Sequence, residues 1–228
     1  MFVVPLIAAL AGAGFAATVL NQFRSRRRPY QAAWAAALAM FAAGAAFETV
    51  GIAAGWTALT YKSYYLFGAV LNVGWLGVGT LYLLAPRRVG HIAAAVMGLI
   101  SVAALAGVLA APTDAGLLQA RVPGRGAIGA PAPIFALVSN LPGSVILIGG
   151  AAWSAWQAFR RKAPGSRVLG TALIAAGAFI VAGGHSYAQL SGFYVIQPAA
   201  EAAGILIMFG GYLAVESRRR QTVRPEAV

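Results

Sequence analysis

Seven long apolar segments constrain this chain more than any other feature of its sequence. They cover approximately residues 2–22, 30–54, 62–85, 90–111, 132–159, 166–190 and 193–214. A helix needs about 20 apolar residues to cross the hydrocarbon core of a bilayer. Of the 228 residues, 60% are hydrophobic and only 10% are charged, which excludes a soluble globular domain and a disordered chain. We therefore predict an all-α, polytopic membrane protein in which one domain, residues 1–228, contains seven transmembrane helices.

The basic residues lie in alternate connections between these segments. All but three of the 17 Lys and Arg residues follow the first, third, fifth or seventh segment, the exceptions being Lys62, Arg121 and Arg125. Because short basic loops stay in the cytoplasm, we expect the N-terminus outside and the C-terminus in the cytoplasm, in the cell inner (plasma) membrane. No basic residue precedes Arg24, so the first segment is interpreted as an uncleaved helix. The net charge of +12 then reflects membrane topology, and the expected partner is the lipid bilayer rather than a nucleic acid.

The first three and last three helices are interpreted as two copies of one unit. A shift of 137 residues places Gly12 on Gly149 and Gly55 on Gly192. Both units carry arginines after their first and third helices, which predicts a parallel 3+1+3 repeat related by an axis along the membrane normal. Chance matching of Ala/Gly-rich helices is the alternative. The boundaries are repeat 1 at about 2–85, a linker helix at about 90–111, an outer loop at 112–131, repeat 2 at about 132–215 and a basic cytoplasmic tail at 216–228.

This architecture resembles the broad seven-helix group that includes microbial rhodopsins, SWEET sugar transporters and PnuC vitamin transporters. Rhodopsins hold retinal on a lysine of helix 7, whereas Lys62 and Lys162 here lie in predicted loops, so we expect no covalently bound retinal. Neither Pro5 nor Pro142 is followed by the glutamine of SWEET-like repeats. The letters at 153–156 match the WxxW pattern of PnuC-like proteins, but an interfacial aromatic belt explains them. The resemblance implies a shared architecture and no specific family.

Two acidic residues, Glu48 and Glu201, fall inside the predicted hydrocarbon region. A charge there costs roughly 2.5–3.5 kcal/mol on insertion scales, and intramembrane acids usually face the bundle interior. At ~1.5 Å per helical residue, both acids lie about 10–12 Å below the predicted outer interface. We therefore predict a polar pocket in the outer half of the bundle that opens outward. The predicted ligand- or proton-binding residues are Glu48, Tyr65, Asn72, Trp75, Asn140, His185, Gln197 and Glu201.

Three chemistries fit this set of side chains. Two neighbouring buried carboxyl groups favour proton exchange. A divalent metal held by Glu48, His185 and Glu201 is a second interpretation, and no other cofactor is implied. A cationic or polar organic ligand against an aromatic wall of Tyr65 and Trp75 is the third. Asn72, Asn140 and His185 also have purely structural alternatives as hydrogen-bonding groups between helices or near the headgroups.

The leading functional hypothesis is a transporter of a small solute or cation, with proton coupling as an option. The alternative is a retinal-free, opsin-like or GPCR-like sensor that binds a small-molecule ligand outside and signals through a partner protein. No arrangement of nucleophile, base and acid is visible, so the sequence favours a non-enzymatic role and leaves an enzyme as an unsupported alternative. The GxGxxG letters at 124–129 follow no strand, so they do not predict a dinucleotide site. The GxxxG of Gly51 and Gly55 is interpreted as packing within the chain, with a homo-oligomer as the alternative.

Overall fold

A computed structural model describes residues 2–124 and 126–221 of the protein. Within these ranges the regular structure is helical, apart from one isolated bridge between Thr113 and Ile128. The helices are α1 (Val3–Arg26), α2 (Pro29–Ala54), α3 (Ala58–Tyr64), the π-helix η1 (Tyr65–Leu71), α4 (Asn72–Leu84), α5 (Arg87–Ala110), the short η2 (Leu117–Gln119), α6 (Ala132–Arg160), α7 (Gly165–Ser191), the short η3 (Tyr194–Ile196) and α8 (Gln197–Gln221).

Seven helical spans among the described residues are long and apolar enough to cross a membrane. The third of them, Ala58–Leu84, consists of α3, η1 and α4 in succession. The prediction of an all-α chain with seven helices long and apolar enough to span a membrane is confirmed. The last helix is longer than predicted, since α8 continues to Gln221. Residues 222–228 of the predicted cytoplasmic tail lie outside the described residues.

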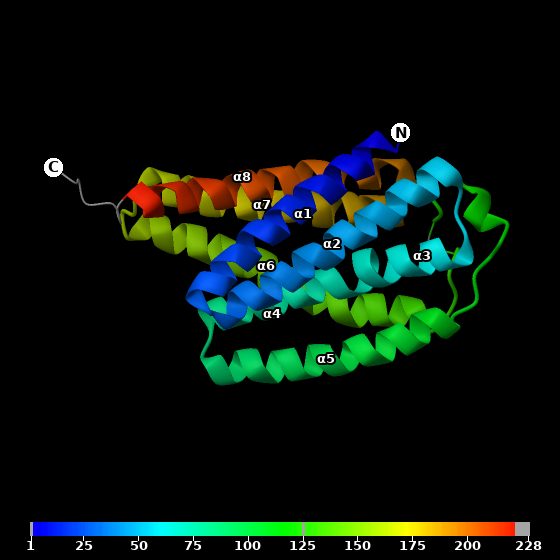
Figure 1. Ribbon diagram of the computed structural model, residues 1–228, viewed down its shortest axis with the longest axis horizontal. Coiled ribbons are helices and arrows are strands. Elements are labelled where there is room, and N and C mark those ends of the chain that lie inside the picture. Colours follow the sequence, from blue (N-terminus) through cyan, green and yellow to red (C-terminus); the bar gives the residue numbers. More distant parts are fainter. Residues whose placement is uncertain (1, 125, 222–228) are drawn as a thin grey trace.

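Six of these spans surround a common core, and the seventh packs against them from outside. In order around the ring, α1 contacts α2, α2 contacts α4, α4 contacts α6, α6 contacts α7, α7 contacts α8, and α8 returns to α1. The α5 helix lies outside this ring, against α4 and α6 (Figure 1). Helices from the two ends of the polypeptide therefore lie side by side, which allows residues of α2 and α8 to reach one interior.

The two ends of the bundle differ in charge. The connections α1–α2, α4–α5 and α6–α7 lie at one end, which we call the basic end because Arg24, Arg28, Arg88 and Arg161 lie in or beside these connections. The α2–α3, α5–α6 and α7–α8 connections lie at the other end, which we call the loop end (Figure 1). Arg125 and Arg224, which entered the predicted charge pattern, lie outside the described residues.

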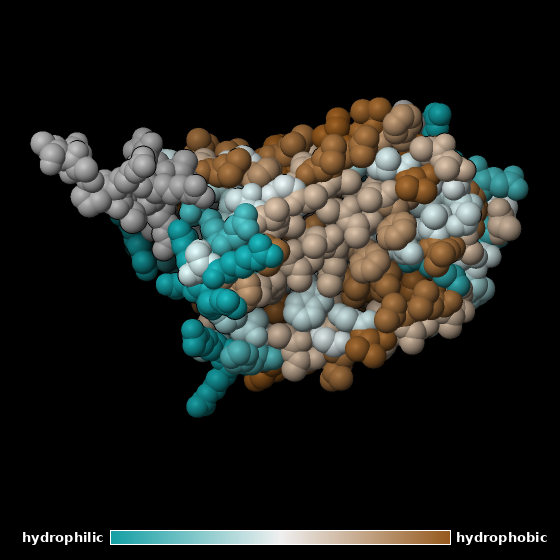
Figure 2. All heavy atoms as spheres, in the orientation of Figure 1, coloured by the Kyte–Doolittle hydropathy of each residue, from teal (hydrophilic) through white to brown (hydrophobic). Residues whose placement is uncertain are grey.

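The flank of the bundle between these ends is apolar. Figure 2 shows hydrophilic side chains gathered at the ends, with mostly apolar residues between them. Large side chains such as Leu99 on α5 and Leu141 on α6 are 74% and 63% exposed. Extended exposed apolar surface of this kind marks a surface that another apolar phase covers. The flank therefore suits contact with lipid.

Glycines set the closest contacts between helices. A Cβ atom added at Gly44 of α2 would lie 2.7 Å from the Cα atom of Gly68 in η1. A Cβ atom added at Gly177 of α7 would lie 2.5 Å from the carbonyl oxygen of Gly204 in α8. Membrane helices associate through such small residues because backbones can then approach closely. Both crossings lie within a turn or so of the two intramembrane acids, Glu48 and Glu201.

Candidate functional site

Four polar side chains meet inside the ring, in its loop-end half. We call Glu48 of α2, Tyr64 of α3, and Gln197 and Glu201 of α8 the carboxyl cluster. The Nε2 atom of Gln197 donates hydrogen bonds to the Tyr64 hydroxyl at 2.7 Å and to Oε1 of Glu201 at 3.0 Å. Glu48 lies close enough to Glu201 and to Tyr64 for their charges to interact. Acids from opposite ends of the polypeptide thus share one interior site.

Glu48 is the least satisfied member of the carboxyl cluster. Its side chain is 0% exposed, and neither carboxyl oxygen has a hydrogen-bond partner among the described residues. Tyr64 and Gln197 are also buried, whereas Glu201 is partly exposed. A buried polar group without a partner is costly, and an ionised one costs more. The cluster therefore needs a neutralising or hydrogen-bonding species beside Glu48.

The structure separates the predicted layer of polar residues into two depths. Gly44 faces Gly68 where the antiparallel second and third spans cross. Counting from that crossing, Glu48 is level with Tyr64, while Asn72 is level with residues about one turn before Gly44. Asn72 thus lies about two helical turns nearer the basic end than Tyr64 does.

Asn72 and Asn140 belong to this deeper level, which is built around the π-helix η1. Asn140 of α6 donates its Nδ2 to the Ala69 carbonyl, and Ser139 donates its hydroxyl to the Val70 carbonyl at 2.6 Å. Single π-helical turns are frequent at functional sites. The Oδ1 atoms of Asn72 and Asn140 are buried without a hydrogen-bond partner in the described ranges. Asn140 and Ser139 therefore tie α6 to η1, and both asparagines keep free acceptor capacity.

The π-helix also changes which tyrosine reaches the acids. Spacing along an uninterrupted α-helix groups Tyr65 with Asn72 and Trp75, but the wider turns of η1 displace the residues before it by about one position. Tyr64 accordingly joins the carboxyl cluster, and Tyr65 packs near Tyr61 with ring centroids 6.2 Å apart. Trp75 donates its Nε1 to Ser101 of α5 at 3.1 Å, on the outside of the ring. Trp75 is thus engaged with α5, whereas Tyr65 lies in the same span next to Tyr64.

His185 lies at a suitable depth but outside the carboxyl cluster. It is partly exposed on α7, two turns from Ala178, which packs into the core shared with α1, α2 and α8. Nowhere in the described ranges do three His, Asp or Glu side chains gather as a metal-binding set. Glu48, His185 and Glu201 are therefore not brought together as metal ligands. The residues that do meet supply two carboxyl groups, a phenol and an amide, a donor set that suits a proton or a hard cation better than a transition metal.

The loop end covers the carboxyl cluster. The Trp56 ring packs against Tyr61 and Tyr64, with centroids 5.5 and 5.4 Å away, and its Nε1 donates to the Arg121 carbonyl at 3.1 Å. Trp56 also lies over Gly51 of the same chain, which leaves no room for a side chain there. The predicted outward opening is thus filled by aromatic rings and by the 112–131 connection in this conformation.

A cavity of about 380 Å³ lies beside this cover. Its lining residues are Gly51, Ile52, Gly55, Trp56, Ala115, Leu118, Gln119, Ala120 and Arg121. Neither Glu48 nor Glu201 lines it. The cavity is therefore separate from the carboxyl cluster, with Trp56 between them.

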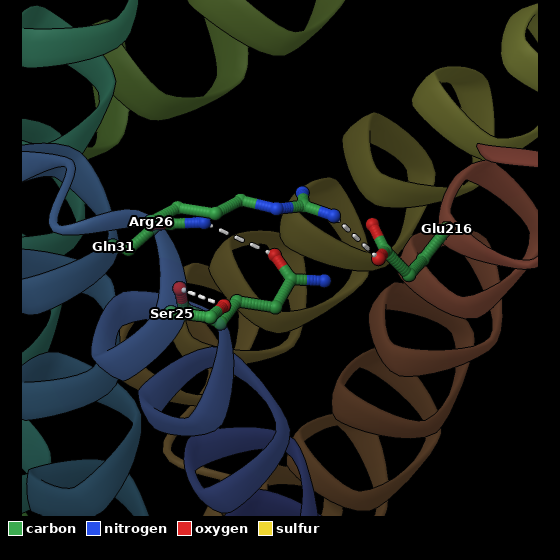
Figure 3. A network of polar contacts seen from close by, with 5 residues as sticks. Ser25, Arg26, Gln31 and Glu216 are labelled. Atoms are coloured by element: carbon green, nitrogen blue, oxygen red, sulfur yellow. Dashed lines mark hydrogen bonds and ion pairs between the residues drawn. The ribbon is translucent and has the colours of Figure 1, made fainter. Parts of the chain in front are cut away.

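A second group of polar residues, which we did not predict, lies at the basic end between α1, α2 and α8. We call Gln22, Arg26, Gln31, Tyr212 and Glu216 the basic-end layer. Arg26 Nη2 pairs with Glu216 Oε1 at 3.1 Å, and Gln31 Nε2 donates to Gln22 Oε1 at 3.1 Å (Figure 3). Glu216, which the sequence analysis assigned to the tail, is only 9% exposed.

Part of the basic-end layer could have been predicted from residue spacing in the sequence. Glu201, Gly204 and Met208 recur at helical spacing on one face of α8, and continuing by fours reaches Tyr212 and Glu216. The seventh segment was predicted to end at residue 214, so Glu216 was not included in this helical face.

No protein-family model, curated protein or solved structure matches the chain. The described helices fit a seven-helix membrane fold, and any more specific assignment depends on the chemistry of the site.

Removing the Tyr64 hydroxyl tests the geometry of the carboxyl cluster. Tyr64→Phe takes away one acceptor of Gln197, so the free energy of unfolding in detergent should fall by about 1 kcal/mol. Tyr61→Phe is the matched control, because its hydroxyl reaches only the Gly124 carbonyl of the loop, at 3.3 Å. Equal losses in the two variants, measured by denaturant titration, would contradict the arrangement.

Proposed function

We propose that this chain is a membrane transporter of a small cation or cationic solute, coupled to protons through the carboxyl cluster. The observation that carries this proposal is Glu48, fully buried beside Glu201 with both carboxyl oxygens unpartnered in the described residues. Two neighbouring carboxyl groups at hydrocarbon depth do not both remain charged without a counter-charge. A proton or a cation that binds and leaves supplies that counter-charge.

The chemistry of the carboxyl cluster narrows the cargo. The polar groups that share the carboxyl cluster with Glu48 are the Tyr64 hydroxyl, the Glu201 carboxyl and the Gln197 amide. Oxygen ligands favour hard cations, and carboxyl groups also bind protonated amines through charge-assisted hydrogen bonds. An alkali-metal ion or a small organic ammonium compound is therefore the cargo class that we propose.

Polar groups lie on both sides of an apolar core, and this arrangement supports a transport role for the two acids over a purely structural one. The carboxyl cluster lies on the loop-end side of a core that includes Phe15, Leu38 and Met208, and the basic-end layer lies on the other side. All three regions have members on α2 and α8. Acids that only fastened these helices together would need no second polar layer along the same line.

We also infer the topology and the repeat. Most of the Lys and Arg residues lie at the basic end, which supports placing that end in the cytoplasm of a cell whose inner (plasma) membrane holds the protein. Gly55 and Gly192, which match under the 137-residue shift, end α2 and α7 with φ angles of 92° and 73°. The contacts of α1 with α8 and of α4 with α6 pair the two three-helix units at both seams. These features support a parallel 3+1+3 repeat.

The cavity at the loop end favours one alternative function. At about 380 Å³ it is large enough for a small molecule, and it is separated from the carboxyl cluster by Trp56. A sensor would bind a ligand in that cavity and signal through a partner protein at the basic end.

Flux and binding measurements on one preparation separate the two functions. A panel of alkali-metal ions and organic ammonium compounds is screened for thermal stabilisation of the purified protein, and each hit is then tested for uptake into proteoliposomes under an imposed proton gradient. The transporter proposal expects that a stabilising compound is also taken up and that collapse of the gradient slows uptake. Stabilisation without flux for every hit would refute transport and favour the sensor.

A further inference from the structure

The basic-end layer lies at a seam between the first and last parts of the chain. The ring closes where α1 meets α8, and the Arg26–Glu216 ion pair joins these two helices. Its side chains are 30% and 12% exposed, so the pair sits at the rim of the core rather than out in solvent. Separating the pair would remove one polar link between α1 and α8 at this end, beside the neighbouring Gln22 and Tyr212 side chains.

The interior of the basic-end layer is incompletely hydrogen-bonded. Among the described residues, four buried atoms have no partner: Gln22 Nε2, Arg26 Nη1, Gln31 Oε1 and Tyr212 OH. Buried polar groups normally find a partner in protein or in ordered water. These four include both donors and an acceptor, the kinds of group that buried water molecules satisfy in proteins. The layer is thus suited to hydration.

An aromatic contact separates the basic-end layer from the carboxyl cluster. Phe15 of α1 stacks on Phe209 of α8 at 5.0 Å and contacts Tyr212 at the same centroid distance. Phe15 is 5% exposed and belongs to the apolar core. Because Tyr212 belongs to the layer and touches Phe15, a movement of α8 at the ion pair is passed directly to this aromatic contact.

We propose that the basic-end layer is the gate on the basic side of the transport route. The Arg26–Glu216 pair latches α1 to α8, and the Phe15–Phe209 stack blocks the path above it. Separation of the pair hydrates the layer, parts the aromatic rings and opens the carboxyl cluster to the basic side. This inference rests on the proposed function, because it names how access to the same acids is controlled.

The absence of cysteine from the chain makes the gate directly testable. A thiol at Gln31, a residue 1% exposed, reports on the layer, and a thiol at Ala16, 9% exposed, reports on the apolar core beyond it. Each single-cysteine protein is treated with a membrane-impermeant maleimide applied to the basic end in reconstituted vesicles. Arg26→Gln in either background should raise the labelling rate by about tenfold, because a partly buried ion pair contributes an amount between that of an exposed pair and that of a fully buried one.

Two controls separate gating from general disruption. Arg27→Gln removes the same charge at the same helix end, but Arg27 lies over the Phe23 ring and not on Glu216, so labelling should keep its original rate. The exchanged pair, Arg26→Glu with Glu216→Arg, should restore slow labelling. Unchanged rates in Arg26→Gln, equal acceleration in Arg27→Gln, or fast labelling in the exchanged pair would each overturn the gate.

The labelling assay needs no cargo, so the gate proposal and the transporter proposal can be refuted independently of each other. Accelerated labelling in a protein that carries no tested compound would leave a hydrated gate and refute the proposed cargo. Flux that depends on Glu48, together with labelling that never accelerates, would refute the gate and keep the transporter.

Discussion

Glu48→Gln is expected to lower coupled uptake into proteoliposomes by about 100-fold, the factor that corresponds to the ~2.5–3.5 kcal/mol cost of an uncompensated intramembrane charge. The amide keeps the size of the side chain but carries no charge and takes up no proton. Glu201→Gln should also abolish uptake, because the second carboxyl contributes to the same site. Uptake is measured with each identified cargo at matched protein orientation and density.

The same position should show opposite effects on function and on stability. Glu48→Met replaces two unpartnered buried oxygens with an apolar chain of similar size, which should raise the free energy of unfolding by about 1–3 kcal/mol. Thr49→Val is the neighbouring control, because the Thr49 hydroxyl bonds only to Ala45 of its own helix, at 2.8 Å, and uptake should persist. Retained uptake in both Glu48 variants would refute the role of this acid.

Gly177→Leu should produce the largest loss of stability. A Cβ at Gly177 would lie 2.5 Å from the Gly204 carbonyl oxygen, and a backbone atom cannot move aside as a flexible side chain can. Separating α7 from α8 at this point also displaces Glu201, one turn from Gly204. We expect a loss of about 3 kcal/mol, or failure to fold, as for severe overpacking of a core.

Gly183→Leu is the matched control for this substitution. Gly183 is in the same helix, but an added Cβ there meets no atom within 4 Å. Folded yield and denaturant midpoints in detergent should therefore stay near the original values for Gly183→Leu and fall sharply for Gly177→Leu. Similar behaviour of the two variants would contradict the close α7–α8 crossing.

The sequence sufficed for the spans, because length and apolarity alone determine whether a helix can cross a bilayer. It also indicated that Glu48 and Glu201 would share a site, since glycines lie on the same helix faces and mark the contacts between helices. Gly44 and Gly204 do lie at such contacts in the structure. Interior acids are expensive enough that their placement follows from general physical rules.

The sequence did not reveal details that depend on local irregularity. Because of the π-helix η1, Tyr64 rather than Tyr65 accepts the hydrogen bond from Gln197. No residue pattern in the sequence predicts the wider turn. Trp75 contacts α5 because α5 packs outside the ring. The hydropathy of the α5 segment does not predict this position. The Arg26–Glu216 pair joins residues 190 positions apart, so only the closure of the ring by α1 and α8 brings them together.

Chemical modification of the intramembrane carboxyl groups tests the central claim most directly. A hydrophobic carbodiimide enters the bilayer and reacts with protonated carboxyl groups there, and mass spectrometry identifies the modified residue. We expect modification at Glu48 or Glu201, slowed by the same cation that stabilises the protein and restored when that cation is removed. Modification at neither acid would contradict a cation- and proton-binding site between them. So would a modification rate that is the same with and without the cation.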